Sequence, residues 1–181
     1  MMLLCLPTTY MFKKQPRIEV KPNATDRKLI RVGWLFIGLI SVFLGVIYQN
    51  IPRIIPTHFN LEGVADGFGG KSILWSLLGI NILLYFGLMF LATKIKPWNF
   101  NFPVTLTENN APKVYALGIR MLVVMNLIIV WVFGLLIISI LGQVFYDQGL
   151  GLWMLPLIMI PIFGCIFYFT TQMMKAADEK K

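Results

Sequence analysis

Four long apolar runs, separated by short polar segments, dominate the pattern of the chain. Each run is about 20 residues long, which is the length that an α-helix needs to cross a hydrocarbon core of about 30 Å. The runs predict transmembrane helices at about residues 32–49, 73–93, 114–141 and 152–173. The expected fold class is therefore an all-α polytopic membrane protein with four transmembrane helices.

Composition supports a membrane protein. Of the 181 residues, 57% are hydrophobic and 13% are charged, whereas about 25% of the residues in a soluble domain are charged. The mean hydropathy is +0.74. The net charge of +8 would suit a nucleic-acid partner, but the cations flank the apolar runs and form no separate basic domain. We therefore expect the lipid bilayer, and no nucleic acid, as the environment of this chain.

Lysine and arginine are distributed unevenly between the two sets of connecting segments. Fourteen of the 16 lie in the two terminal segments and around the connection between the second and third runs, and the other two are Arg53 and Lys71. Cytoplasmic segments of membrane proteins carry an excess of these residues. The bias predicts cytoplasmic N and C termini and an outward loop between the first two helices. It divides the chain into a basic cytoplasmic tail (1–31, starting at Met1 or Met11), one four-helix membrane domain (32–175, with the outward loop at 50–72) and a short cytoplasmic tail (176–181).

Few polar side chains interrupt the apolar runs. Arg120 follows Lys113 by about two helical turns, so we expect its side chain to snorkel to the membrane interface. Asn81 and Asn126 are expected to hydrogen-bond between helices rather than to line a polar path. No run contains an acidic residue or a histidine, which disfavours an ion-coupled transporter.

The outward loop has the residue types of a built structure rather than of a spacer. It contains the only histidine of the chain, His58, and two of the eight acidic residues, Glu62 and Asp66. One histidine with two carboxylates is a weak metal-ligand set, because metal sites in proteins need three or four converging ligands. We expect no metal and no other cofactor, and hydrogen bonds from His58 and Asp66 to the loop backbone instead.

Prolines and glycines predict the backbone of this loop. Pro52 and Pro56 favour an extended segment and disfavour a helix. Gly63 permits a positive φ, and the dipeptide Asp66-Gly67 is typical of a tight turn. Ser72 lies at the N-cap position of the next apolar run, and the neighbouring Lys71 is expected at the membrane interface, within reach of Asp66.

The order of residues in the loop resembles the signature loop of a bacterial membrane family of unknown function, which also forms the front half of SdpI-type immunity proteins. The resemblance covers about residues 35–95. The positions that carry it are Pro56, His58, Phe59, Asn60, Gly63, Asp66, Gly67, Phe68, Gly69 and Lys71.

The resemblance implies a function for the outward loop. It implies a non-enzymatic, multi-pass protein of the bacterial cytoplasmic membrane, with a receptor or immunity-type role in which these ten residues recognise a peptide or an envelope partner or shape the loop. Two alternatives stay open. One is a small membrane transporter or transporter subunit, and the other is a metal-dependent membrane enzyme that uses the His58 loop. The sequence leaves the ligand and the oligomeric state open.

Overall fold

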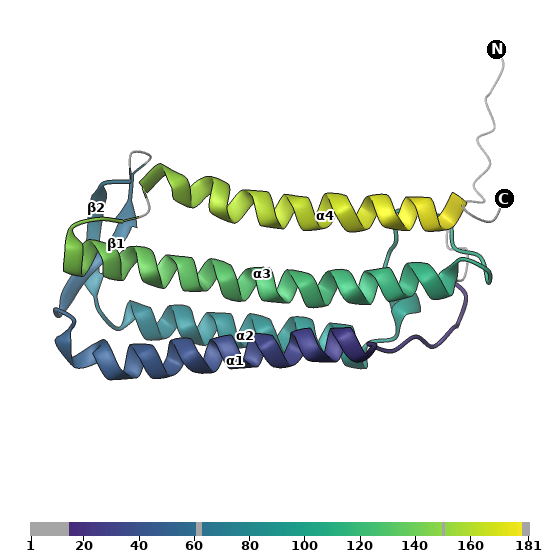
Figure 1. Cartoon of the computed structure of the whole chain (residues 1–181), viewed down its shortest axis with the longest axis horizontal. Coiled ribbons are helices and arrows are strands. Elements are labelled where there is room, and N and C mark those ends of the chain that lie inside the picture. The colour runs from purple at the N-terminus through teal and green to yellow at the C-terminus, as the bar shows by residue number, and fades with distance from the viewer. Residues whose placement is uncertain (1–14, 61–62, 150, 179–181) are drawn as a thin grey trace, which may run out of the picture.

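The computed structural model describes residues 15–60, 63–149 and 151–178. Within them, four long helices lie side by side and a two-stranded hairpin covers one end (Figure 1). All four helices are long and apolar enough to cross a membrane, so the predicted fold class is confirmed. The elements are α1 (Ala24–Ile47), β1 (Ile54–Phe59), β2 (Ala65–Gly70), α2 (Ile73–Lys94), α3 (Ala111–Tyr146) and α4 (Met154–Asp178).

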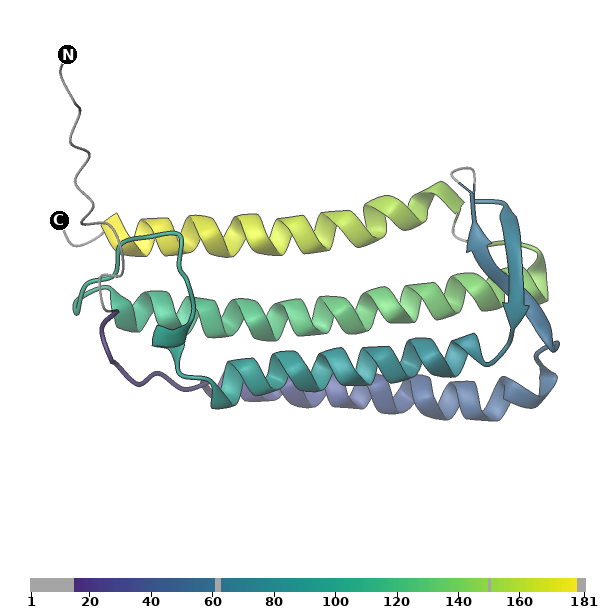
Figure 2. The ribbon, with the colours of Figure 1, turned by 180° about the vertical axis from the view of Figure 1, so that it is seen from behind.

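Helix α3 is the centre of the helical layer, and α1, α2 and α4 each pack against it (Figure 2). One apolar core lies between α1, α2 and the second half of α3, and a smaller core joins the first half of α3 to α4. Many large apolar side chains point away from both cores, most of them on α1, α2 and α4. These side chains face the hydrocarbon when the helices lie in a bilayer.

The two ends of the helical layer differ. One end, here the hairpin end, holds the β1–β2 hairpin and the connection between α3 and α4 (Figure 1). The opposite end, here the terminal end, holds residues 15–23, the connection between α2 and α3, and the end of α4. The first and last described residues of the chain therefore lie at the same end of the helical layer.

The first helix begins at Ala24 rather than at about residue 32, because a capping box starts it within the charged segment. The side chain of Asn23 accepts a hydrogen bond from the backbone N–H of Asp26, and the Asp26 carboxylate accepts one from the backbone N–H of Asn23. These two bonds satisfy donors that an uncapped helix leaves without partners. An apolar run shows only where charged residues end, so the start of the first helix was predicted too late in the chain.

Residues 15–23 also hold a defined place at the terminal end. The hydroxyl of Tyr115 donates to the backbone oxygen of Pro16 at 2.8 Å. The ammonium of Lys96 lies 2.6 Å from the carboxylate of Glu19 and, with Lys21, holds the pKa of that carboxyl below its ordinary value. The predicted basic tail is therefore packed against the helices from residue 15, and both candidate starts, Met1 and Met11, lie outside the described residues.

Arg120 has a partner on α1 that the sequence did not predict. Its guanidinium forms an ion pair with the carboxylate of Asp26 and donates a second hydrogen bond to the Asn23 side chain at 3.0 Å. Asp26 is only 3% exposed. The pair therefore connects the start of α1 to α3, and the Asp26 carboxylate is held within the packed structure.

Contacts between α2 and its neighbours centre on Tyr85. Its ring lies over Gly33 of α1, its hydroxyl donates to the backbone oxygen of Ile30, and its own backbone oxygen accepts from the Asn126 amide at 3.1 Å. The expected bond between Asn126 and Asn81 is not formed. The interhelical bond goes to the backbone instead, and both amide atoms of Asn81 have no hydrogen-bond partner among the described residues.

Candidate functional site

The loop between the first two long helices forms an antiparallel hairpin, with β1 and β2 paired along their length. Ile55 lies opposite Gly69, Pro56 opposite Phe68, and His58 opposite Gly67, with irregular register on both sides of His58. The extended backbone predicted around Pro56 is confirmed. A side chain at Gly67 would meet the Cβ atom of His58 at 2.8 Å, so glycine there leaves the room that the imidazole needs.

The turn of the hairpin lies at Gly63 and not at Asp66-Gly67, which belongs to β2. Gly63 has a φ of +81°, a conformation that favours glycine. The Asn60 side chain stabilises the turn by accepting a hydrogen bond from the backbone N–H of Val64 at 2.9 Å. Ser72 occupies the N-cap position of α2 as predicted, but its side chain makes no capping hydrogen bond.

Two features attach the hairpin to the helices. Ile51 and Ile55 are 3% and 1% exposed and belong to the core between α1, α2 and α3. The Lys71 ammonium donates to the backbone oxygens of Tyr48 and Ile51, at 2.8 and 2.9 Å, and lies 4.5 Å from the centre of the Tyr48 ring. Lys71 therefore binds carbonyls that follow α1, where a cation is favourable, and does not pair with Asp66.

His58 and Asp66 meet on the outer side of the hairpin. Nδ1 of the imidazole forms a hydrogen bond to the carboxylate of Asp66, so the two side chains bond each other rather than the loop backbone as expected. The side chains are 73% and 45% exposed, and an exposed pair of this kind contributes at most about 1 kcal/mol to stability. Its main effect is to fix the orientation of the imidazole ring.

The metal-ligand set considered from sequence is brought together only in part. His58 and Asp66 are adjacent, and Glu62 lies outside the described residues. Within residues 15–60, 63–149 and 151–178, no three histidine, cysteine or acidic side chains converge. The geometry that the structure describes is that of a polar pair on a surface.

Three apolar side chains of the hairpin are also exposed. Phe68 is 64% exposed, Ile54 is 63% exposed and Val64 is 57% exposed. Phe68 and Asp66 are two residues apart on β2 and therefore point to the same face. The hairpin thus presents an aromatic ring, two aliphatic side chains and a fixed imidazole, which we call the hairpin surface.

A cavity of about 210 Å³ lies behind the turn, between the hairpin and the start of α4. Phe59, Asn60 and Gly63 line it from the hairpin, and Ser139 lines it from α3. The remaining lining residues come from the α3–α4 connection and α4: Gly151, Leu152, Met154, Leu155 and Ile158. Of the two aromatic residues singled out in the loop, Phe59 faces this cavity while Phe68 faces outward.

Sequence reasoning missed the contribution of the α3–α4 connection. A Cβ atom at Gly63 would lie 2.3 Å from the Cα atom of Gly151, which itself has a φ of +53°. Two glycine backbones therefore touch where the turn meets this connection. Gly149 and Gly151 in the α3–α4 connection could have indicated a close backbone contact, but nothing in the sequence pairs these residues with the hairpin.

Replacement of Gly63 by alanine tests this contact. We expect Gly63→Ala to destabilise the hairpin end by about 1–3 kcal/mol, because the new Cβ atom overlaps the Gly151 backbone and the φ is unfavourable for alanine. Proteolysis of the hairpin in detergent-solubilised protein measures the effect. Gly70→Ala is the matched control, since its Cβ atom would have only the Ser72 hydroxyl nearby, at 3.5 Å; equal cleavage of the two variants would contradict the contact.

A model of a domain of unknown function, DUF1648, matches residues 35–84. The match runs from α1 through the whole hairpin into α2. It is consistent with the predicted similarity to a membrane family of unknown function. Neither a curated protein nor a solved structure matches the chain.

Proposed function

We propose that this non-enzymatic integral membrane protein recognises a peptide or an envelope protein through the hairpin surface. The observation that carries the proposal is the exposure of Phe68, at 64%, on a hairpin whose other side is fixed by Ile55 and Lys71. Phenylalanine is among the residues that are enriched at protein–protein interfaces, and Phe68 shares a face of β2 with Asp66, the partner of the His58 imidazole. An immunity-type or receptor role in a bacterial membrane is the specific form of this proposal.

The orientation of the protein is part of the proposal. Fourteen of the 16 lysine and arginine residues of the sequence belong to the two terminal segments or flank the connection between α2 and α3, and only Arg53 and Lys71 belong to the segment between α1 and α2. The positive-inside rule then puts the terminal end in the cytoplasm of a bacterial cell and the hairpin outside the cytoplasmic membrane. Partners would come from the outer side.

Photocrosslinking in native membranes tests recognition. Phe68, replaced by a photoreactive phenylalanine analogue, is expected to give one recurrent adduct with a peptide or envelope protein, identified by mass spectrometry. In the same background, His58→Ala and Asp66→Ala should lower the adduct yield several-fold at equal protein level, because each removes the hydrogen bond that orients the surface.

The matched control carries the same analogue at Phe163, an exposed phenylalanine of α4 that faces lipid. It should give lipid adducts and no recurrent protein partner. If Phe68 gives the same products as Phe163, recognition by the hairpin surface is wrong. Retention of stoichiometric zinc by the purified protein, lost in His58→Ala, would instead favour the metal-dependent enzyme.

A further inference from the structure

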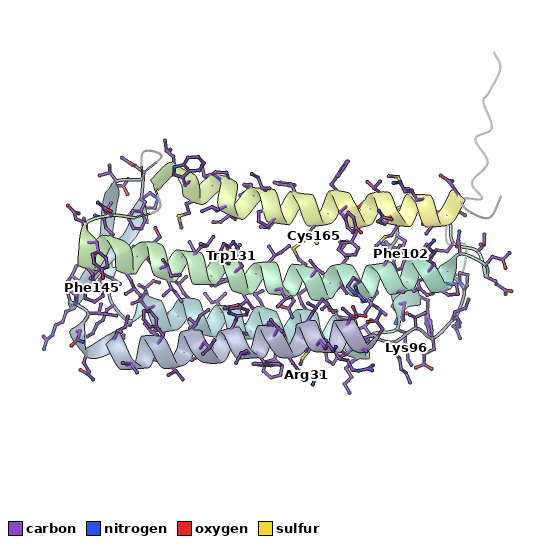
Figure 3. All side chains as sticks on the ribbon, in the orientation of Figure 1. Arg31, Lys96, Phe102, Trp131, Phe145 and Cys165 are labelled. Atoms are coloured by element: carbon purple, nitrogen blue, oxygen red, sulfur yellow. The ribbon has the colours of Figure 1, made fainter. Side chains whose placement is uncertain are left out.

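A long apolar groove runs along the helical layer between α1 and α3. It has a volume of about 520 Å³. Its walls include Val32, Phe36 and Phe43 of α1 and Leu127, Trp131 and Gly134 of α3. Figure 3 labels Trp131 midway along α3. The groove therefore lies within the part of both helices that crosses the hydrocarbon, where an apolar chain is a suitable occupant.

The floor of the groove depends on a glycine. Gly134 brings no side chain, and a Cβ atom there would have only the Ile40 side chain nearby, at 3.6 Å. A larger residue could therefore be added without backbone overlap, and its side chain would enter the groove. Phe36, Phe43 and Trp131 are each about half exposed, so they border the space without filling it.

The terminal end of the groove is basic. Lys28 lies one helical turn before Val32 and therefore on the groove side of α1. One stripe of α3 contains four residues that are seven positions apart: Lys113, Arg120, Leu127 and Gly134. The stripe is apolar along the groove, at Gly134 and Leu127, and cationic beyond the groove toward the terminal end, at Arg120 and Lys113.

The charge at this end stays positive after pairing. Arg120 is paired with Asp26, which is the one acidic residue of α1. The same first turns of α1 also carry Arg27, Lys28 and Arg31, and Figure 3 labels Arg31 on the part of α1 toward the terminal end. An apolar groove that ends in surplus positive charge at the depth of the headgroups is complementary to an anionic phospholipid.

We infer that the groove between α1 and α3 binds one acyl chain of an anionic phospholipid from the leaflet at the terminal end. The acyl chain lies along Phe36, Trp131 and Gly134, and the Lys28 ammonium binds the phosphate. This site is separate from the hairpin surface and does not depend on its function.

Native mass spectrometry tests the site on the full chain. The protein is reconstituted in vesicles with equal amounts of phosphatidylglycerol and phosphatidylcholine of identical acyl chains, extracted in mild detergent, and examined for retained lipid. We expect one retained phosphatidylglycerol, preferred over phosphatidylcholine by about fivefold or more, as one cation near an anionic headgroup predicts. Retention of the two lipids in the vesicle ratio would overturn the inference.

Two variants separate the groove from the charge. Gly134→Leu should fill the groove and abolish lipid retention, while Gly38→Leu, on the same helical layer with nothing within 4 Å of its new Cβ atom, should retain it. Lys28→Gln should lower the preference for phosphatidylglycerol by about fivefold. Lys175→Gln, an exposed lysine in the last turn of α4, should leave the preference unchanged.

The outcomes that contradict the site are distinct. Equal retention by Gly134→Leu and Gly38→Leu would show that lipid binds elsewhere. A dimer mass in the wild-type protein that disappears in Gly134→Leu would show that a second copy occupies the groove. An unchanged preference for phosphatidylglycerol in Lys28→Gln would contradict the proposed contact between Lys28 and the phosphate.

Discussion

Arg120→Ala is expected to lower the free energy of unfolding by about 3 kcal/mol, because it leaves the buried carboxylate of Asp26 without its cation. The side chain of Asp26 is 5% exposed and that of Arg120 is 29% exposed, which places the expected cost at the lower end of the range for broken buried pairs. Thermal unfolding of the purified protein in detergent, followed by far-ultraviolet circular dichroism, measures the loss.

The double variant Asp26→Asn, Arg120→Met distinguishes an unpaired charge from lost packing, because asparagine is uncharged and keeps an oxygen that can accept the capping hydrogen bond from the backbone N–H of Asn23. Removal of both partners avoids the buried charge, so we expect it to recover at least half of the lost stability. Glu19→Ala is the control, since its pair with Lys96 is exposed and such pairs contribute little to stability. A loss in Arg120→Ala no larger than that in Glu19→Ala would contradict the role of the pair.

The number of helices followed from the sequence, because an apolar run of membrane-crossing length has few other stable conformations. The ends of the helices did not follow. Asp26 and Asn23 start α1 by bonding each other's backbone, a local arrangement that hydropathy does not contain. The pairing of Asp26 with Arg120 joins residues far apart in the chain, so snorkelling was the only expectation that local spacing could support.

The hairpin was predictable only where the local sequence restricts the backbone. Pro56 restricts its own backbone, so the extended segment could be inferred from sequence. The turn was assigned to Asp66-Gly67, yet this dipeptide lies within β2, with Gly67 opposite His58, and the turn is at Gly63. Glycine at position 67 reflects space for a neighbour rather than a positive φ, and this distinction requires the partner strand.

Close packing between α1 and α2 gives the second large effect. We expect Gly33→Leu to destabilise the protein by about 3 kcal/mol, because overpacking of a filled core displaces its neighbours. A Cβ atom at Gly33 would lie 2.4 Å from the hydroxyl oxygen of Tyr85, and Tyr85 is fully buried. The displaced ring would also lose its hydrogen bond to Ile30.

Trp34 reports this change directly, since its ring lies 4.8 Å from that of Tyr85 in an edge-on arrangement. Gly38→Leu makes the same substitution on the same helix toward open space, so it should leave both the tryptophan fluorescence and the melting temperature nearly unchanged. In a Tyr85→Ala background, the added leucine enters the space of the missing ring and should cost much less than in the wild type. An equal cost in both backgrounds would mean that Gly33 serves the helix backbone alone, whereas a smaller cost identifies the contact with Tyr85 as the reason that α1 carries glycine at this position.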